Sequence, residues 1–333
     1  MVFVNLCILL VIILVAAEIF TNALEHLGQR LKISEGVTGS IFAAVGTALP
    51  ETSIPLIALL SFSQNIDVRH DISVGAILGA PLMLSTLAIF IMGVAAFKKR
   101  GVKGSLSPEL SGLKRDLNYF IVAFLIAGLA LYIPKELNEL KYFVGISLIL
   151  IYFFYVRETI RASSELVEKG HVTEADRPMF ISRLGFSDNK ITIIVQLMIG
   201  LGLIVIGARG FIYNIEIVSN MLGVSVLLLS ILIVPIATEL PEKINSVLWI
   251  RRGRDTLAFG NITGAMVFQG TILPGIGIML TPWEAQKELL FLFVATLLGA
   301  LWLRYLAYNS SIKIWHLILN GTFYLGYLFL VLT

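Results

Sequence analysis

The sequence predicts an all-α polytopic membrane protein, with ten transmembrane helices arranged as two inverted five-helix repeats. Three observations lead to this fold class: the apolar composition, the distribution of Lys and Arg along the chain, and a motif that occurs twice. Of the 333 residues, 57% are hydrophobic and 14% are charged, and the mean hydropathy is +0.89. Soluble domains carry roughly 45–50% apolar and about 25% charged residues. The composition therefore excludes most soluble enzymes and nucleic-acid binders.

Ten segments are apolar over the length of about 20 residues that a membrane-spanning helix needs. The first has no basic start and no small-residue cleavage site, so we interpret it as a mature span rather than a signal peptide. Five spans belong to a first half, residues 1–160, and five to a second half, residues 190–333, with a cytoplasmic linker at 161–189. The expected spans are 3–24, 36–62, 72–97, 118–134, 141–160, 190–212, 222–249, 256–281, 287–306 and 312–332.

The basic residues predict the orientation of these spans. Of the 25 Lys and Arg, 19 fall in the odd-numbered connections and four in the even-numbered ones. Cytoplasmic loops carry an excess of Lys and Arg, so the odd connections are predicted to be cytoplasmic and both termini extracellular, at the plasma membrane. The net charge of +3 is then a signal of topology and not of nucleic-acid binding.

The two halves share an internal repeat. When Leu31 is set against Leu222, the sequence TALPE at 47–51 falls on TELPE at 238–242. The sequence GAILGA at 75–80 then falls on GNITGA at 260–265 after a six-residue difference in the connection. The repeats are predicted at about 31–97 and 222–281. Because each half has an odd number of spans, the halves cross the membrane in opposite directions, as in many secondary transporters. Channels are also built this way.

The duplicated motif predicts a cation site. Proline inside a helix frees the carbonyl four residues earlier, so Pro50 and Pro241 each expose a backbone oxygen. Beside them stand Glu51 and Glu242, each one turn from a threonine, Thr47 or Thr238. Carboxylate, hydroxyl and carbonyl oxygens are the ligands that calcium prefers. The competing interpretation is a pair of proline kinks with hydrogen-bonded glutamates. Because each charge inside the membrane costs about 2.5–3.5 kcal/mol, two glutamates at equivalent positions favour an ion-binding site over a packing role.

These segments resemble the α-repeats of the cation/calcium exchanger superfamily, and within it the sodium/calcium exchangers, whose motif reads GTSLPE. The resemblance covers both repeats and the ten-helix topology. It implies ion ligation by Glu51 and Glu242. It also implies roles for Thr47 and Thr238, and for the backbone one helical turn earlier, at Ala44 and Pro235. It also implies that the first and sixth helices are the elements that slide during transport.

The chain departs from the family pattern where sodium ligands are usual. The serine of the motif is Ala48 in the first repeat and Glu239 in the second, and a later polar position is Leu84 or Gln269. We take Glu239 and Gln269 as further candidate ligands. Buried carboxylates have raised affinities for protons, so the substitutions favour protons as counter-ion, whereas the family resemblance favours sodium. Three further charges, Arg209, Lys243 and Glu18, have more than one interpretation. Arg209 and Lys243 each snorkel or form a structural ion pair, in which Arg209 pairs with Glu239 or Glu18, or Lys243 substitutes for a bound cation. Glu18 is structural or lines an entry path.

The expected activity is secondary-active exchange of Ca²⁺, or a related divalent cation, for Na⁺ or H⁺. The chain has no P-loop and no zinc-type histidine spacing, so we expect neither an enzyme nor a resident cofactor. The expected partners are inorganic cations and the lipid bilayer, without nucleic acid, and the protein is expected to function as a monomer. Two alternatives stay open: a cation channel, and a non-transporting scaffold or sensor that retains the fold. Two tryptophans, Trp283 and Trp315, are predicted to anchor the chain at the membrane interface.

Overall fold

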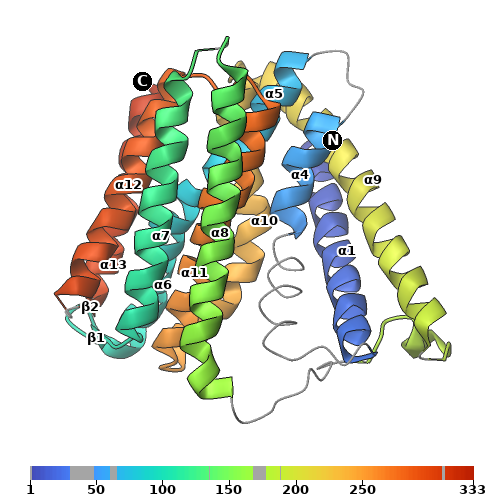
Figure 1. The fold of residues 1–333 in the computed structure, drawn as a ribbon, viewed down its shortest axis with the longest axis horizontal. Coiled ribbons are helices and arrows are strands. Elements are labelled where there is room, and N and C mark those ends of the chain that lie inside the picture. The colour runs from blue at the N-terminus through green and yellow to red at the C-terminus, as the bar shows by residue number, and fades with distance from the viewer. Residues whose placement is uncertain are drawn as a thin grey trace. The chain divides into compact units, whose positions relative to one another are not determined.

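A computed structural model describes residues 2–30, 49–60, 66–134, 136–167, 178–187, 189–309 and 312–333 (Figure 1). Within these residues, eight helices are long and apolar enough to cross a membrane, and two shorter apolar helices lie at Glu51–Leu60 and Val226–Ile236. These positions correspond to the expected spans, so the protein is a helical polytopic membrane protein. Two-residue strands, β1 (Ser105–Leu106) and β2 (Ile312–Lys313), pair antiparallel and are an addition to the predicted all-α fold.

The described residues form two compact units, and each unit draws on both halves of the chain. The first comprises 1–69 and 156–226, and the second comprises 70–155 and 227–333. The first unit contains α1 (Val2–Arg30), α4 (Leu49–Leu60), η4 (Ser182–Leu184) and α9 (Lys190–Leu222). The second contains most of α5 (Ile66–Leu82) and α8 (Asn138–Val167), together with η2 (Met83–Ala88), α6 (Ile89–Arg100), α7 (Leu110–Leu129), η3 (Ala130–Tyr132), α10 (Val226–Arg251), α11 (Asp255–Leu280), α12 (Lys287–Tyr308) and α13 (Ile314–Leu332).

The first unit is built on the contact between α1 and α9, the first and sixth expected spans (Figure 1). Glycine lets their backbones approach, as is common between membrane helices: a Cβ at Gly200 would lie 3.1 Å from the carbonyl oxygen of Ala16. The fully buried Gln196 joins the two helices, because its Nε2 donates to Asn22 Oδ1 at 3.0 Å and to the Ile19 carbonyl at 2.9 Å.

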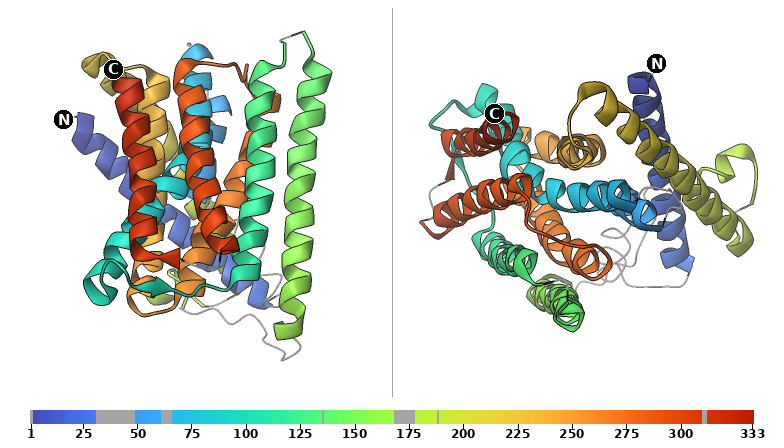
Figure 2. Two further views of the ribbon diagram at one scale, coloured as in Figure 1. Left: turned by 90° about the vertical axis from the view of Figure 1, so that its left-hand side faces the viewer. Right: turned by 90° about the horizontal axis from the view of Figure 1, so that it is seen from above.

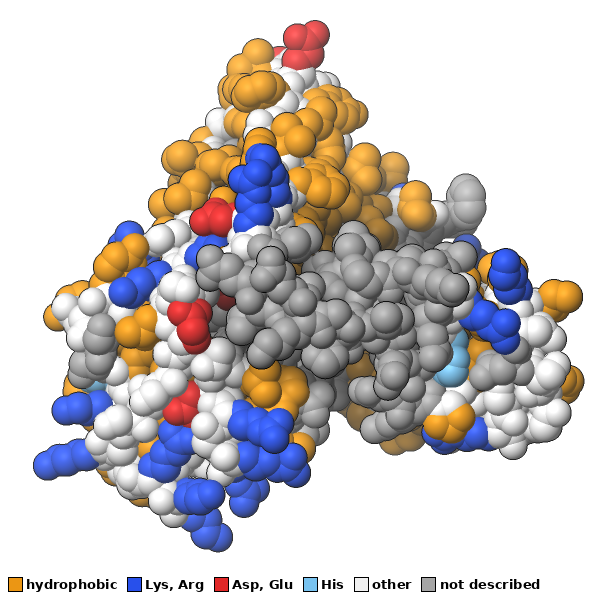
Figure 3. Space-filling view, turned by 60° about the horizontal axis from the view of Figure 1, so that its bottom comes forward, with side chains coloured by type: hydrophobic (Ala, Val, Ile, Leu, Met, Phe, Trp, Pro, Cys, Tyr) orange, Lys and Arg blue, Asp and Glu red, His pale blue; other side chains and the backbone are white. Residues whose placement is uncertain are grey.

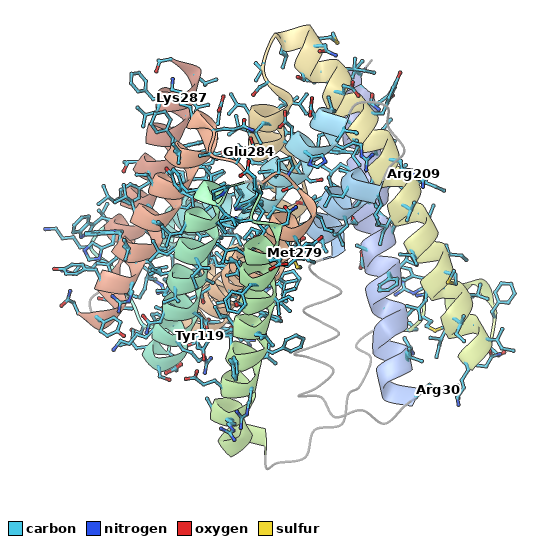
Figure 4. The ribbon with its side chains drawn as sticks, turned by 45° about the horizontal axis from the view of Figure 1, so that its top comes forward. Arg30, Tyr119, Arg209, Met279, Glu284 and Lys287 are labelled. Carbon is cyan, nitrogen blue, oxygen red and sulfur yellow. The ribbon has the colours of Figure 1, made fainter. Side chains whose placement is uncertain are left out.

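The second unit is a bundle in which α7 packs on α11 and α12, and α13 packs on α6 and α12 (Figure 2). Glycine again sets the closest approaches. A Cβ at Gly275 of α11 would lie 2.7 Å from the carbonyl oxygen of Gly145 on α8. Met279 of α11, which is labelled in Figure 4, also contacts Gly145. The prediction of an interfacial anchor is wrong for Trp283. Its side chain is 1% exposed and its Nε1 donates to the Ala127 carbonyl at 3.0 Å, so the ring belongs to the core.

One end of the second unit carries most of its basic side chains, and Figure 3 shows Lys and Arg gathered there. They include Lys98, Lys99 and Arg100 in the last turn of α6 and Arg251 at the end of α10. Arg100 also forms an ion pair within this end of the unit. Its guanidinium bonds both carboxylate oxygens of Asp255 at 2.7 and 2.9 Å, and thereby ties α6 to the first turn of α11.

Candidate functional site

The structure describes the predicted site residues unequally. Thr47 and Ala44 lie outside the described residues. Position 242 belongs to the helix α10, but the side chain of Glu242 lies outside the described part of the chain. The structure does describe the side chains of Glu51, Pro235, Thr238, Glu239 and Gln269, four of which belong to the second unit.

In the first repeat, the structure places Glu51 on α4. Its side chain is 4% exposed, and the neighbouring Ser53 is also buried. The α4 helix packs on α9 and α1 within the first unit. Its carboxyl end is held by Arg69, which donates from Nε to the Ala58 carbonyl at 3.2 Å and from Nη2 to the Leu59 carbonyl. A cation at a helix carboxyl terminus is favourable, so Arg69 fixes the end of the helix that carries Glu51.

In the second repeat, Thr238 and Glu239 are fully buried on α10. The Thr238 hydroxyl donates to the Val234 carbonyl one turn earlier, at 3.0 Å. That bond uses the hydroxyl proton and leaves oxygen lone pairs for an incoming donor or cation. A second tie fixes α10 against α11, because Asn261 Nδ2 donates to Ser246 Oγ at 2.8 Å. Asn261 belongs to the duplicated glycine motif, which therefore helps to position the TELPE helix.

Glu239 is engaged by two buried side chains. Gln269 Nε2, on α11, donates to Glu239 Oε1, and Lys243 Nζ lies 3.5 Å from Glu239 Oε2. Lys243 is 4% exposed, and Glu239 and Gln269 are fully buried. Lys243 stands four residues after Glu239, so the two side chains share a helix face. Of the roles considered for Lys243, the ion pair is the one observed, and its partner is Glu239.

Arg209 belongs to the first unit. It lies on α9, where its side chain is exposed (Figure 4). Within the second unit, Glu239 is paired with Lys243 of its own helix. Glu18, the other candidate partner of Arg209, is exposed on α1.

Glycines of the first repeat hold α5 against α10. A Cβ at Gly75 would lie 2.8 Å from the Leu227 carbonyl oxygen, and one at Gly79 would lie 2.8 Å from Pro235 Cγ and in collision with the Ile231 carbonyl. Pro235 has no amide hydrogen to offer that carbonyl. Only a residue without a side chain fits this contact, so the first GxxxG motif seats α5 on the helix of the second TxLPE motif.

Another buried carboxylate, Asp116 on α7, was missed in the sequence. Thr263 Oγ1 on α11 donates to its Oδ2 at 2.7 Å, and Tyr155 Oη on α8 donates to its Oδ1 at 3.1 Å. Arg115 Nη2 lies 3.6 Å from Oδ1. The sequence signal was an acidic residue at the edge of an apolar span, which basic-residue counting treats as part of a loop. Because the carboxylate bonds groups on two other helices, it orders the α7–α8–α11 contact.

Among the described residues, no group of three or more His, Cys, Asp or Glu side chains is arranged so that it could hold a metal ion. The motif segments contribute the buried carboxylates of Glu51 in the first repeat and Glu239 in the second, and α10 adds the hydroxyl of Thr238. Such an arrangement suits binding and release of a cation within a helical core.

Comparison with known proteins places this arrangement in a family. The sequence model described as "Sodium/calcium exchanger protein" matches residues 1–159 and 192–333. The chain belongs to the sodium/calcium exchanger family. Members of this family are membrane antiporters and not enzymes. The match leaves out the region of the predicted linker.

Relatives with similar sequences span most of the chain. The sodium/calcium exchanger MaX1 of Methanosarcina acetivorans is 24% identical over an alignment of 363 residues, gaps included, and the alignment covers 98% of each chain. The inner membrane protein YrbG of Escherichia coli is 23% identical over 280 residues, which cover 83% of this chain and 78% of YrbG. The matched regions thus include most of the length of these two relatives.

Solved structures confirm the fold. The crystal structure of the H⁺/Ca²⁺ exchanger CAX matches with a TM-score of 0.72 at 15% identity, covering all of this chain and 82% of the other. The sodium-calcium exchanger NCX_Mj matches with a TM-score of 0.57 at 18% identity, covering 98% and 99%. Both a proton-coupled and a sodium-coupled exchanger thus share the fold of this exchanger.

Proposed function

We propose that this protein is a secondary-active antiporter that moves Ca²⁺, or a related divalent cation, across the membrane in exchange for Na⁺ or H⁺. The observation that carries the proposal is the TxLPE motif, which occurs once in each half of a chain with the exchanger fold. A charge inside a membrane is expensive and marks an ion pathway by default. Finding the same glutamate twice, at equivalent positions, favours transport over packing.

The proposed ligands are Glu51 and Glu242, assisted by Thr47, Thr238 and the backbone at Ala44 and Pro235. Burial supports this choice: Glu51 is 4% exposed. In the sequence, position 242 stands four residues after Thr238 and four residues before Ser246, both of which are fully buried. Glu239 and Gln269, which the sequence also suggested as ligands, are bonded to each other, and we assign them a supporting part.

The proposed topology has ten crossings in two inverted repeats with both termini extracellular, at the plasma membrane. The two short apolar helices Glu51–Leu60 and Val226–Ile236 fall at the expected second and seventh crossings, which supports the count of ten. The basic side chains at one end of the second unit support a cytoplasmic face there. The proposed transporting species is a monomer without a resident cofactor.

The test is radioactive calcium uptake into liposomes that contain the purified protein. Uptake is expected under an outward Na⁺ or H⁺ gradient and not without one, and the gradient that drives it identifies the counter-ion. Flux of Ca²⁺ that needs no counter-gradient would instead identify a cation channel. Absence of flux under every gradient, with folded protein, would identify a scaffold or sensor and refute the proposal.

The site assignment has its own test. Glu51→Gln and Glu242→Gln each remove one proposed ligand charge, and each is expected to reduce the uptake rate at least about tenfold, the scale on which changes near a metal site act. Glu139→Gln, at an exposed position in the first turn of α8, is the matched control and is expected to transport normally. Uptake that survives the combined Glu51→Gln and Glu242→Gln exchange would refute the assignment.

A further inference from the structure

Two basic side chains converge on one exposed tyrosine ring where α7 and α12 pack together in the second unit (Figure 2). Lys114 Nζ of α7 lies 4.9 Å from the centroid of the Tyr308 ring, and Arg304 Cζ of α12 lies 4.8 Å from the same centroid. A cation at this distance is attracted to the face of an aromatic ring. The Tyr308 side chain is 49% exposed, so the group is open to the surroundings of the protein.

Asn118 of α7 fixes the geometry of this group. Its Nδ2 donates to Tyr308 Oη at 3.2 Å, and its Oδ1 accepts from Arg304 Nε at 2.6 Å. The guanidinium has five N–H donors, so the bond to Asn118 leaves the four N–H groups of its two Nη atoms for another acceptor. We refer to Lys114, Asn118, Arg304 and Tyr308 as the basic–aromatic cluster. Its cations are held in position before a ligand arrives, which lowers the cost of binding one.

The cluster contains two cations and no carboxylate. Both basic groups lie within 5 Å of one ring centroid, so they are closer together than the screening length of about 10 Å in physiological salt. Among the described residues, no Asp or Glu side chain forms an ion pair with Lys114 or Arg304. Membrane topology requires basic residues at this end but not their convergence on one point. The cluster therefore has the composition of an anion-binding site.

An apolar stripe leads away from the cluster along α12. The side chains on this outer face are Val294, Leu298, Leu301, Tyr305 and Tyr308, each 44–60% exposed. Their spacing of four, three, four and three residues places them on one face of the helix. From Val294 to Tyr308 the helix rises about 21 Å, which exceeds half the thickness of a hydrocarbon core of about 30 Å. The stripe is thus long enough to follow the acyl chain of a lipid through one leaflet.

A second stripe continues from the cluster along α7. After Lys114 and Asn118, the same face presents Val122, Leu125 and Leu129, each at least 45% exposed. The α7 helix begins and the α12 helix ends at the cluster, so both stripes lead away from it in the same direction. The surface therefore has a cationic end and an apolar body, which match the two parts of an anionic phospholipid.

We propose that the basic–aromatic cluster and the two stripes bind one anionic phospholipid. Lys114 and the Nη groups of Arg304 bind its phosphate, the exposed tyrosines lie at the level of its glycerol backbone, where tyrosine is enriched in membrane proteins, and its acyl chains follow the stripes. The inference concerns a ligand other than the transported ions. Only the assignment of the lipid to the cytoplasmic leaflet rests on the proposed topology.

The test is native mass spectrometry of the full-length protein in detergent, titrated with dioleoyl phosphatidylglycerol or with dioleoyl phosphatidylcholine. The acyl chains of the two lipids are identical, and only phosphatidylglycerol carries a net negative charge. The first phosphatidylglycerol is expected to bind at least about tenfold more tightly than phosphatidylcholine, because two basic residues face its phosphate. Glycerol phosphate, which has the anionic group without the acyl chains, is expected not to displace it.

Three variants separate the cluster from the general charge of this end. Lys114→Gln with Arg304→Gln is expected to weaken phosphatidylglycerol binding about 30-fold, or about fivefold for each basic residue at the membrane surface. The matched control, Lys103→Gln with Arg252→Gln, removes two exposed charges from the same end of the unit and is expected to bind like the wild type. Asn118→Ala keeps every charge and is expected to weaken binding about threefold, because the cations lose their positioning.

Each outcome decides for or against the lipid site. Equal affinity of the wild type for the two lipids refutes it whatever the variants do. Equal losses in the cluster variant and the control variant also refute it, because they show attraction to the basic end as a whole. Displacement by glycerol phosphate refutes a lipid ligand in favour of a free anion. If the double variant at the cluster does not fold, Asn118→Ala and the comparison of the two lipids still decide. None of these measurements requires transport, so the proposed function can fail while the lipid site stands.

Discussion

The contact of α5 with α10 can be tested by adding one methyl group. In Gly79→Ala the new Cβ would collide with the Ile231 carbonyl and lie 2.8 Å from Pro235 Cγ and 2.9 Å from Ile231 Cα. Two of these three atoms are backbone, so the helices must separate. Overpacking costs about 1–3 kcal/mol, and the better helix propensity of alanine returns about 1 kcal/mol. The net loss of stability is about 0–2 kcal/mol.

The matched control is the equivalent glycine of the second repeat. A Cβ at Gly264 would meet only Tyr155 Oη, at the ordinary contact distance of 3.7 Å. Gly264→Ala is therefore expected to be neutral or to stabilise the protein by up to about 1 kcal/mol. Thermal unfolding in detergent, followed by tryptophan fluorescence, should give a lower midpoint for Gly79→Ala and an equal or higher one for Gly264→Ala. Equal midpoints for the two variants would refute the close approach of α5 to α10.

Two other predictions concern the end of the second unit where α6 meets α11. Asp255→Asn removes the carboxylate that binds the Arg100 guanidinium at 2.7 and 2.9 Å. This variant is expected to lower the free energy of unfolding by about 1–3 kcal/mol. The control is Arg252→Gln, at an exposed position, which should leave the thermal midpoint unchanged. The pKa of Glu109 lies below its ordinary value of 4.5, because burial raises it less than hydrogen bonds from the first turn of α7 lower it. Its stabilising effect is then complete above pH 4.5 and is lost as the pH falls through the lower folded-state pKa. The thermal midpoints of wild type and Glu109→Gln should accordingly differ at neutral pH and converge in acid. A difference that is constant with pH would show that the charge of the Glu109 carboxylate, which caps the amino-terminal end of α7, is not responsible.

The sequence predicted the helices well because hydrophobic length is a local property. All ten expected spans contain helix in their described residues. The boundaries moved outward where polar residues extend a helix beyond the bilayer: α8 was expected at 141–160 and runs over Asn138–Val167. The repeat signal was equally local, since a shared TxLPE can be found by aligning the chain with itself.

Partner choice could not be predicted, because it depends on packing between distant segments. Lys243 was known to point away from Glu242, yet only the structure shows that it faces Glu239. Trp283 illustrates the same limit. Its place between two apolar spans suggested the interface, but the chain takes a left-handed conformation there, with φ of 46°, and turns the ring into the core. Gly277 then has to be a glycine, because a Cβ would lie 2.6 Å from the ring.

The strand pair constrains the order in which the chain can be assembled. β1 follows α6, but its partner β2 begins at residue 312, so Ser105 pairs with Lys313 more than 200 residues later along the chain. The ion pair of Arg100 with Asp255 likewise cannot form until residue 255 has been synthesised. During synthesis at about 5–20 residues per second, the α6–α7 connection therefore spends roughly 10–40 seconds at the membrane surface before its partners exist. The contacts that fix this end of the second unit can therefore form only after most of the chain has been synthesised.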